Sequence, residues 1–482
     1  MELSFSSGTL ILSGTPRGFV ECWPKLAKYL VWDHRALHYR GHALNYTKIL
    51  RIIKNRSDWI GSSRFSRADV AALFESFVDK VPQWQPVSWP SLSLRELRPE
   101  QQAAVAAWLP SRSGYIVMPT GTGKTEVALS LMAHCGTSTL IVSPIRDLMY
   151  QWQRRILAAT GFDPGVIGDR IYQVKPISVT TYDSAGIHMD HLGNQFGLII
   201  FDECHHLPGE LRQDAARMCV APYRLGLTAT PHRSDGRQAD LEHLIGFKVY
   251  ELPLEQVRGK SLADYEVVRI PVHLTTEERA RYDHLSKVVR IYMLKRREER
   301  PNYSWEDLCG ESARTPEARH ALKSYHAKQA IEDRAAEKLR IIEDLFRLHA
   351  DEPCLIFAGS NAMARDVSLR FLIPCLLSHC GKQERQEVLS GLQQGRYPAI
   401  VANRVLDEGV DLPAVKVAIV IGGTASSRQA KQRLGRILRK SGKTRATLYE
   451  IVCRETNEVD RSRKRRSSEA YKSTRQRRTP EC

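Results

Sequence analysis

A glycine-rich segment near residue 120 constrains the fold of this chain more than any other feature. Pro119–Thr125 has the sequence Pro-Thr-Gly-Thr-Gly-Lys-Thr and directly follows the apolar run Tyr115–Met118. A buried strand that runs through such a loop into a helix is typical of NTP-binding α/β domains, in which backbone N–H groups close around phosphate oxygens. For this loop alone, a glycine-rich turn that binds nothing is the alternative. The residues expected at ATP and Mg²⁺ are Gly121, Thr122, Gly123, Lys124 and Thr125, with the Thr125 hydroxyl as a metal ligand.

A second apolar run, Leu198–Phe201, ends in the acidic pair Asp202 and Glu203. Parallel α/β sheets bind their ligands at the carboxyl ends of their strands, so both acids are expected in the same site as the loop. Asp202 is predicted to bind Mg²⁺, and Glu203 to activate the attacking water in phosphoryl transfer. An ordinary exposed acid pair is the alternative, and the presence of the loop makes it the weaker interpretation.

Further segments occur in an order that resembles superfamily 2 helicases, from Leu97 to about Val452. They are Leu97–Gln101, Val142–Leu148 with Gln151 and Trp152, Thr228–Thr230, Cys354–Phe357, Asp407–Asp411 and Gln432–Arg439. The resemblance implies two tandem RecA-like parallel-sheet motor domains of the α/β class. It also implies that Arg98 and Gln101 read adenine. The other implied roles are nucleotide binding by Gly409, Asp411, Gln432 and Arg433, coupling by His205, Thr228 and Thr230, and DNA contact by Arg146, Thr181, Arg233 and Asp235.

Arg436 and Arg439 are spaced three residues apart on a predicted helix. Both can therefore project from one face toward a γ-phosphate, as arginine fingers do. A solvated basic face that includes Arg433 and Lys440 is the alternative. With Lys124 and Glu203 upstream, the arginine finger is the favoured interpretation.

Within superfamily 2 the chain resembles the XPB or Rad25 type of 3′ to 5′ DNA helicase. The resemblance rests on Leu225–Pro231, on Ile245–Glu251, on the Gln-Arg-Leu-Gly-Arg-Ile-Leu-Arg segment and on a domain that precedes the motors. That group has an Arg-Glu-Asp element where this chain has Arg233-Ser234-Asp235. Loss of the central acid is expected to affect strand separation more than ATP hydrolysis. A double-stranded DNA translocase that does not fully unwind is therefore an expected alternative.

The composition favours a polyanionic partner. The chain has 482 residues and a formal net charge of +17. Residues 461–478 contain nine Lys or Arg and one acid, Glu469, so about half of this charge lies in a short C-terminal segment. Single-stranded, forked or duplex DNA is the expected partner, with binding driven by counterion release. A solvated tail without a partner remains equally open for this segment.

The ten cysteines are scattered, and no Cys-x-x-Cys pair occurs. We therefore expect neither a zinc site nor an iron–sulfur cluster, and the scatter suits thiols in a reducing cytoplasm, with nucleoid association in a prokaryote. No membrane segment is expected, because no run of eighteen apolar residues occurs.

The landmarks predict five parts: 1–88, resembling a damage-recognition domain; 89–270, the first motor; 271–349, a helical, thumb-like insertion; 350–460, the second motor; and 461–482, a basic tail. Gly8–Ser13 alternates in a way that suggests an edge strand. In the same domain, Trp32, Arg35, Tyr39 and Arg40 suit either DNA contact or, more commonly, a small aromatic core.

The expected function is an ATP-dependent DNA helicase or translocase, of 3′ to 5′ polarity, in DNA repair such as nucleotide excision repair. The family resemblance suggests a structure-specific endonuclease as partner. A translocase subunit of a restriction or phage-defence system is the main alternative. A nucleotide-gated DNA clamp with negligible turnover is another, and an RNA helicase is less favoured.

Overall fold

The computed structural model describes residues 1–55, 65, 67–230, 236–253, 256, 265–377, 379–403, 415–422 and 446–466. These residues divide into two compact units, Met1–Pro253 and Leu254–Cys482, which are described separately. Among the predicted site residues, eight fall outside the described ranges: Arg233, Asp235, Gly409, Asp411, Gln432, Arg433, Arg436 and Arg439.

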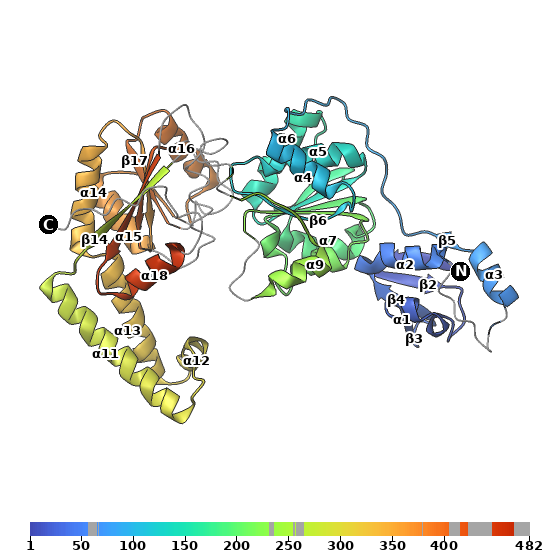
Figure 1. Cartoon of the computed structure of the whole chain (residues 1–482), viewed down its shortest axis with the longest axis horizontal. Coiled ribbons are helices and arrows are strands. Elements are labelled where there is room, and N and C mark those ends of the chain that lie inside the picture. Colours follow the sequence, from blue (N-terminus) through green and yellow to red (C-terminus); the bar gives the residue numbers. More distant parts are fainter. Residues whose placement is uncertain are drawn as a thin grey trace. The chain divides into compact units, whose positions relative to one another are not determined.

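The first unit begins with a small sheet of five strands in the order β3-β4-β2-β1-β5 (Figure 1). Its strands are β1 (Glu2–Ser6), β2 (Thr9–Ser13), β3 (Val31–Asp33), β4 (His38–His42) and β5 (Val78–Asp79), and its helices are α1 (Pro24–Ala27), α2 (Tyr46–Lys54) and α3 (Arg67–Glu75). The edge-strand prediction for Gly8–Ser13 is wrong, because β2 pairs with β1 on one side and β4 on the other. Alternating burial reports that one face of a strand is covered, whether the strand is central or at the edge.

The aromatic residues of this small domain form its core. Tyr39 is fully buried, and its hydroxyl accepts from the backbone N–H of Gly18 and donates to Glu21. Trp32 packs edge-on against Tyr39, with 4.9 Å between ring centroids. Arg35 and Arg40 instead lie on the surface beside Asp33. The more common interpretation, an aromatic core, therefore holds for Tyr39.

A larger sheet of eight strands follows, in the order β13-β6-β12-β11-β7-β10-β8-β9. Its strands are β6 (Ser113–Val117), β7 (Thr139–Ser143), β8 (Gly165–Gly168), β9 (Ile171–Tyr172), β10 (Ile177–Thr181), β11 (Leu198–Asp202), β12 (Tyr223–Thr228) and β13 (Lys248–Glu251). Its helices are α4 (Pro99–Trp108), α5 (Lys124–Cys135), α6 (Arg146–Thr160), α7 (Tyr182–Leu192), α8 (Asp214–Arg217) and α9 (Asp240–Leu244). Every pairing is parallel except that of β8 with β9. Helices cover both faces, with α4, α5 and α6 on one side and α7 and α9 on the other (Figure 1).

The second unit contains a six-stranded parallel sheet in the order β14-β19-β18-β15-β17-β16. Its strands are β14 (Tyr265–Val272), β15 (Cys354–Ala358), β16 (Cys375–Leu376), β17 (Ala399–Ala402), β18 (Val417–Ile421) and β19 (Ala446–Cys453). The helices α14 (Ala336–Leu348), α15 (Asn361–Phe371), α16 (Lys382–Gln393) and α18 (Asn457–Arg466) accompany it. β14 spans the predicted domain limit at residue 270 and pairs with β19 along all eight of its residues.

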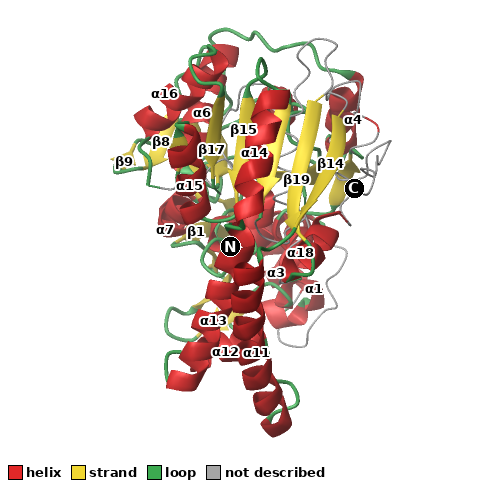
Figure 2. Ribbon diagram, turned by 90° about the vertical axis from the view of Figure 1, so that its left-hand side faces the viewer, coloured by secondary structure: helices red, strands yellow, loops and turns green. Residues whose placement is uncertain are grey.

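A helical arm extends from this second sheet, as Figure 2 shows. α11 (Thr276–Glu299) and α13 (Pro316–Asp333) run side by side, joined by the short helix α12 (Trp305–Glu311). A capping box of Thr275 and Glu278 starts α11, and Pro316 at the first turn starts α13. Tyr303 and Leu308 pack in a small apolar cluster between the helices. The arm thus has a core of its own.

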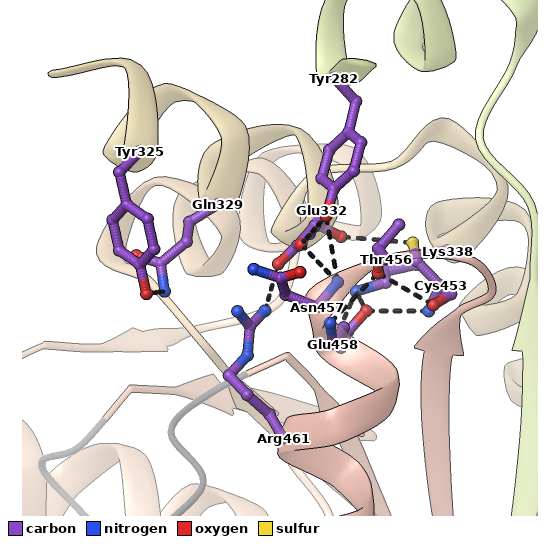
Figure 3. A network of polar contacts seen from close by, with 10 residues as sticks. All are labelled: Tyr282, Tyr325, Gln329, Glu332, Lys338, Cys453, Thr456, Asn457, Glu458 and Arg461. Atoms are coloured by element: carbon purple, nitrogen blue, oxygen red, sulfur yellow. Dashed lines mark hydrogen bonds and ion pairs between the residues drawn. The ribbon is translucent and has the colours of Figure 1, made fainter. Parts of the chain in front are cut away.

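A buried network of charged groups joins the base of this arm to the sheet (Figure 3). The ammonium of Lys338 lies 2.8 and 2.9 Å from the two carboxylate oxygens of Glu458, and both side chains are fully buried. Glu332, at the end of α13, accepts from the Tyr282 hydroxyl of α11 at 2.8 Å and pairs with Arg461 of α18. The four helices α11, α13, α14 and α18 therefore meet in one set of charge-assisted bonds.

The network also changes the interpretation of the C-terminal segment. α18 includes residues 461–466 of the predicted tail, and within it Ser462 is fully buried and donates to Glu450 at 2.9 Å. The first residues of the basic segment therefore belong to the folded second unit. Residues 467–482 lie outside the described part of the chain.

Candidate functional site: an ATP site at the carboxyl edge of the first large sheet

Five of the predicted site segments follow five adjacent strands of the large first sheet. In the sheet order β6, β12, β11, β7 and β10, the segments are the glycine-rich loop, Thr228–Thr230, Asp202–His205, the loop before Arg146, and Thr181. The five strands are parallel, so their carboxyl ends meet at one edge. Segments that are more than a hundred residues apart are thereby brought into one row.

The glycine-rich loop has the backbone that phosphate binding requires. Gly121 and Gly123 have φ angles of 86° and 87°, a region that side-chain-bearing residues rarely adopt. Helix α5 begins at Lys124, directly after Gly123, so its N-terminal N–H groups and Thr125 face the loop. The Thr122 hydroxyl donates to the carbonyl of Pro119 at 2.7 Å, which fixes the turn from within.

Lys124 and Glu203 are partners in this structure. The Lys124 ammonium lies 3.3 Å from Oε1 of Glu203 and 3.4 Å from the carbonyl oxygen of Met118. Both side chains are mostly buried, each with an exposed fraction of 11%. The expected phosphate ligand and the expected base thus neutralise each other.

Asp202 is held by two hydrogen bonds. Its Oδ2 accepts from the indole Nε1 of Trp152 at 2.8 Å, and its Oδ1 accepts from the backbone N–H of Glu203 at 3.0 Å. Burial, followed by the neighbouring charge of Glu203, raises the pKa of Asp202 to about 6. A buried, oriented carboxylate is the kind of oxygen donor that Mg²⁺ prefers.

A chain of polar contacts leads from Glu203 toward Thr230. Oε2 of Glu203 lies 3.4 Å from Nδ1 of His205, and the same nitrogen lies 3.0 Å from the Thr228 hydroxyl. Thr228 donates to the carbonyl of Thr230 at 3.0 Å. Since that bond uses the hydroxyl proton, Nδ1 of His205 is the donor to Thr228. All three residues predicted to couple hydrolysis to movement therefore lie in one connected path.

Gln101 lies against the glycine-rich loop. Its Nε2 donates to the carbonyl of Thr122 at 2.8 Å, and its Oε1 accepts from the backbone N–H of Arg98 at 2.9 Å. These two bonds join the start of α4 to the loop. The adenine-reading role of Arg98 and Gln101 stays a prediction. An adenine that bonds to Gln101 would contact a side chain that is already hydrogen-bonded to the glycine-rich loop.

The predicted DNA contacts in this sheet lie on neighbouring strands. Ser143, at the end of β7, is in register with Thr181, at the end of β10. Thr181 caps α7 by accepting from the N–H of Ser184, and Arg146 opens α6. The Arg146 side chain is 68% exposed and lies 2.7 Å from Asp169. Its guanidinium is therefore accessible to a phosphate.

Two residues at the site were not predicted from the sequence. Trp152 belongs to the segment that follows Val142–Leu148, and the sequence assigns it no role of its own. Tyr182 is fully buried and donates its hydroxyl to the carbonyl of Asp202 at 3.0 Å. A Trp or Tyr in an apolar run predicts core packing, and nothing in the one-dimensional pattern says that its polar atom ends at a carboxylate strand. The sequence signal for the role of Trp152 was the Gln151-Trp152 pair, which follows Pro144 in a segment that resembles superfamily 2 helicases.

Metal-binding clusters and membrane-spanning helices are absent from the described part of the chain. There, no group of three or more His, Cys, Asp or Glu side chains is arranged to hold a metal ion. The nine cysteines in these ranges are free thiols. No helix there is both long and apolar enough to span a bilayer.

Three family models match the chain. The damage recognition domain of the xeroderma pigmentosum group B helicase matches residues 3–57. The res subunit of type III restriction enzymes matches residues 94–233, and the ERCC3/RAD25/XPB C-terminal helicase matches residues 319–469. The resemblance of the first small domain to a damage-recognition domain is thus confirmed. The restriction model covers only the first motor.

Curated relatives point the same way. "DNA 3'-5' translocase XPB2" of Sulfurisphaera tokodaii is 42% identical over 77% of this chain and 84% of its own length. "DNA 3'-5' helicase XPB" is 30% identical in Kineococcus radiotolerans and 28% identical in Mycobacterium tuberculosis. The chain covers 61% and 62% of those two proteins, so it spans less than two thirds of their length. Relatives with XPB names do not favour the restriction or phage-defence alternative.

A solved structure supports the fold. The helicase domain of Pyrococcus furiosus Hef aligns with a TM-score of 0.54 at 15% identity, over 76% of this chain and 98% of that domain. The α/β prediction with parallel motor sheets, a small N-terminal domain and a helical insertion is confirmed. By its sequence, the chain belongs to the XPB/Rad25-type family of superfamily 2 helicases.

Proposed function

We propose that this chain is an ATP-driven DNA translocase of 3′ to 5′ polarity that acts in DNA repair, nucleotide excision repair included. Membership of a helicase family makes it an ATP-hydrolysing enzyme that acts on DNA. One observation supports the catalytic part of the proposal most directly. Lys124, Glu203, His205, Thr228 and Thr230 form a connected path from the phosphate loop to the next strand end.

The path suggests how nucleotide binding prepares the base. ATP phosphates attract the Lys124 ammonium away from Glu203, and the freed carboxylate can then accept a proton from the attacking water. Asp202 and Thr125 would hold Mg²⁺, whose charge would offset that of the β- and γ-phosphates. A movement of Glu203 would displace Thr228 and Thr230 through their contacts with His205. Hydrolysis and conformational change are linked in this way.

Other parts of the site rest on the family resemblance. We propose that Arg436 and Arg439 supply positive charge to the γ-phosphate, with Gly409, Asp411, Gln432 and Arg433 as further nucleotide contacts. Arg146, Thr181, Arg233 and Asp235 are proposed to contact DNA. A structure-specific endonuclease is the proposed partner, and the serine within Arg233-Ser234-Asp235 favours translocation on duplex DNA over full unwinding.

The test is ATP hydrolysis without DNA and with single-stranded, forked and duplex DNA. We expect DNA to stimulate turnover several-fold, and Lys124→Ala to abolish the activity with every substrate. Strand displacement on a forked substrate, measured beside triplex displacement on a duplex, separates unwinding from translocation. Turnover that no DNA changes, or activity that survives in Lys124→Ala, would contradict the proposal.

A further inference from the structure

Helix α6 contacts the ATP site at two points. Trp152, at its centre, donates its indole N–H to Oδ2 of Asp202 at 2.8 Å, and the residue is 3% exposed. One turn later, Arg155 pairs with Glu126, which lies in the first turn of α5 directly after Lys124 and Thr125. The helix therefore contacts both the carboxylate strand and the phosphate-loop helix.

The same helix begins at the predicted DNA contact. Arg146 is its first residue, with a side chain that is 68% exposed. Trp152 follows six residues later, which is about 9 Å along the axis of an α-helix. Because a helix of this length moves as one body, a displacement of its first turn by DNA is carried to the indole and to Arg155.

We propose that Trp152 is a positioning residue for ATP hydrolysis, and that α6 transmits DNA contact at Arg146 to Asp202 through this indole. This inference rests on the proposed function, since it presumes DNA-stimulated hydrolysis. An indole N–H is a donor only, so it fixes one oxygen of the carboxylate and leaves the other oxygen's remaining lone pair for a metal ion. Loss of the donor would let the Asp202 carboxylate rotate.

A second buried tryptophan shows what a purely structural indole does in this domain. Trp108 is fully buried, and its Nε1 donates to the backbone carbonyl of Arg224 at 3.1 Å. Both indoles are therefore buried and hydrogen-bonded, but only that of Trp152 bonds to a side chain of the ATP site. Trp108→Phe is thus a matched control for Trp152→Phe, since each change removes one N–H and keeps an aromatic ring.

The experiment compares these two variants with the unchanged protein. For Trp152→Phe we expect a roughly tenfold lower kcat at saturating DNA, as for the loss of one hydrogen bond to a charged group, with a higher KM for ATP in the presence of Mg²⁺. The affinity of a fluorescent ATP analogue, measured without turnover, should fall in Mg²⁺ and stay unchanged in EDTA. Trp108→Phe should lower the midpoint of thermal unfolding and leave both readouts unchanged.

Transmission through α6 is tested by adding Arg146→Ala to each background. In the unchanged protein, Arg146→Ala should weaken DNA binding and reduce stimulation. In the Trp152→Phe background it should weaken DNA binding by the same factor and produce no further loss of kcat. Multiplicative losses of kcat would overturn transmission, and equal Mg²⁺ dependence in Trp152→Phe and the unchanged protein would overturn the positioning role. If the unchanged protein itself shows no DNA stimulation, the proposed function fails instead.

Discussion

Glu203 has an unusual backbone for an acidic residue. Its φ and ψ angles of 46° and 53° lie in the left-handed region, where residues other than glycine cost of order 1 to 3 kcal/mol. The conformation turns the chain sharply after β11, so that Asp202 and Glu203 both project at the edge of the sheet. The ion pair with Lys124 and the contact with His205 hold the carboxylate there.

For Glu203→Gln we expect kcat to fall by about 100-fold or more, because the amide cannot accept the proton of the attacking water. Affinity for ATP should not weaken, since Lys124 loses a competing partner and becomes free for phosphate. The measurements are steady-state hydrolysis and equilibrium nucleotide binding. Glu210→Gln, a change of a surface acid with an 85% exposed side chain, serves as control. Unchanged turnover in Glu203→Gln would instead support the clamp alternative.

Asp333 is a partly buried acid that the sequence does not distinguish from its neighbours. It ends α13 at the base of the helical arm, and its Oδ1 lies so close to Gly422 that a Cβ added there would collide with it. Burial is the largest cause that raises the pKa of Asp333 to about 6, against attraction by Lys338 and Arg461. The ionised form is therefore disfavoured in the folded state.

This raised pKa predicts a pH-dependent effect of Asp333→Asn. Above about pH 6 the Asp333 carboxyl is ionised in the folded protein. A pKa shift from 3.8 to about 6 then lowers the free energy of unfolding by about 3 kcal/mol. The Asn variant should therefore have the larger free energy of unfolding at pH 8. Its advantage should shrink as the pH falls from 6 to 4, measured by urea unfolding. An equal change in the exposed-site control Asp351→Asn would contradict this.

At the scale of single residues, the sequence predicted what is tied to a local pattern. Lys124, Asp202 and Glu203 stand at fixed positions after apolar runs, and the structure places them together. Trp152 takes its character from the distant Asp202, and Asp333 from burial and from charges that include the distant Glu458 and Arg461. No window of neighbouring residues contains that information, which explains why the sequence did not reveal them.

The helical arm is fastened to its sheet by charge rather than by apolar contact alone. Lys338 of α14 and Glu458 of α18 are paired with no solvent exposure, and Glu458 also accepts from the backbone N–H of Cys453 at 2.8 Å. The remaining bonds of Glu332, Tyr282 and Arg461 lie beside this pair (Figure 3). A buried ion pair adds little net stability, but it is costly to break on one side.

Removing one member of the Lys338–Glu458 pair should therefore lower the stability of the fold strongly. Lys338→Met is expected to lower the free energy of unfolding by about 3 to 5 kcal/mol, because Glu458 is left buried without its partner. The double variant Lys338→Met with Glu458→Gln should recover a large part of the loss in chemical denaturation.

The control pair is Arg347 with Glu343, whose side chains are 71% and 36% exposed. Changing Arg347→Met should cost about 1 kcal/mol or less. Equal losses for Lys338→Met and Arg347→Met would contradict the role of burial. A double variant less stable than both single variants would do the same.

At the scale of elements, continuous apolar runs were predicted well. The apolar runs Tyr115–Met118 and Leu198–Phe201 coincide with β6 and β11. β10, with the sequence Ile-Ser-Val-Thr-Thr, and β14, which contains Pro271, were missed. Polar Thr and Ser residues in β10 are buried beside parallel neighbours, so its pattern lacks the apolar signal. The helical insertion expected between the two motors is present as α11, α12 and α13.

The charge of the whole molecule should govern how it binds DNA. A net charge of +17 predicts affinity that falls steeply with salt, because each neutralised phosphate releases condensed counterions. Part of this charge lies in residues 467–482, which contain Lys472, Arg475, Arg477 and Arg478.

Deleting residues 467–482 removes these four cations and leaves α18 intact. We expect the slope of log K against log salt to become shallower by up to about 4, as expected at about 0.9 per lost phosphate contact. The measurement is fluorescence anisotropy on labelled duplex between 50 and 300 mM salt, values chosen as roughly the range in which counterion release dominates. A full-length variant with the four cations changed to Gln is the matched control. An unchanged slope in both would show that the rest of the molecule makes the phosphate contacts.

The pairing of β14 with β19 determines where this molecule can be divided. β14 precedes the helical arm in the chain, yet it forms the border of the second sheet along eight residues. A fragment that starts at residue 271 would leave β19, whose residues are almost all buried, with its backbone N–H and C=O groups open on one side. An exposed apolar strand edge is a template for intermolecular pairing. A fragment made to study the second motor alone should therefore begin ahead of Tyr265, or it will aggregate through β19.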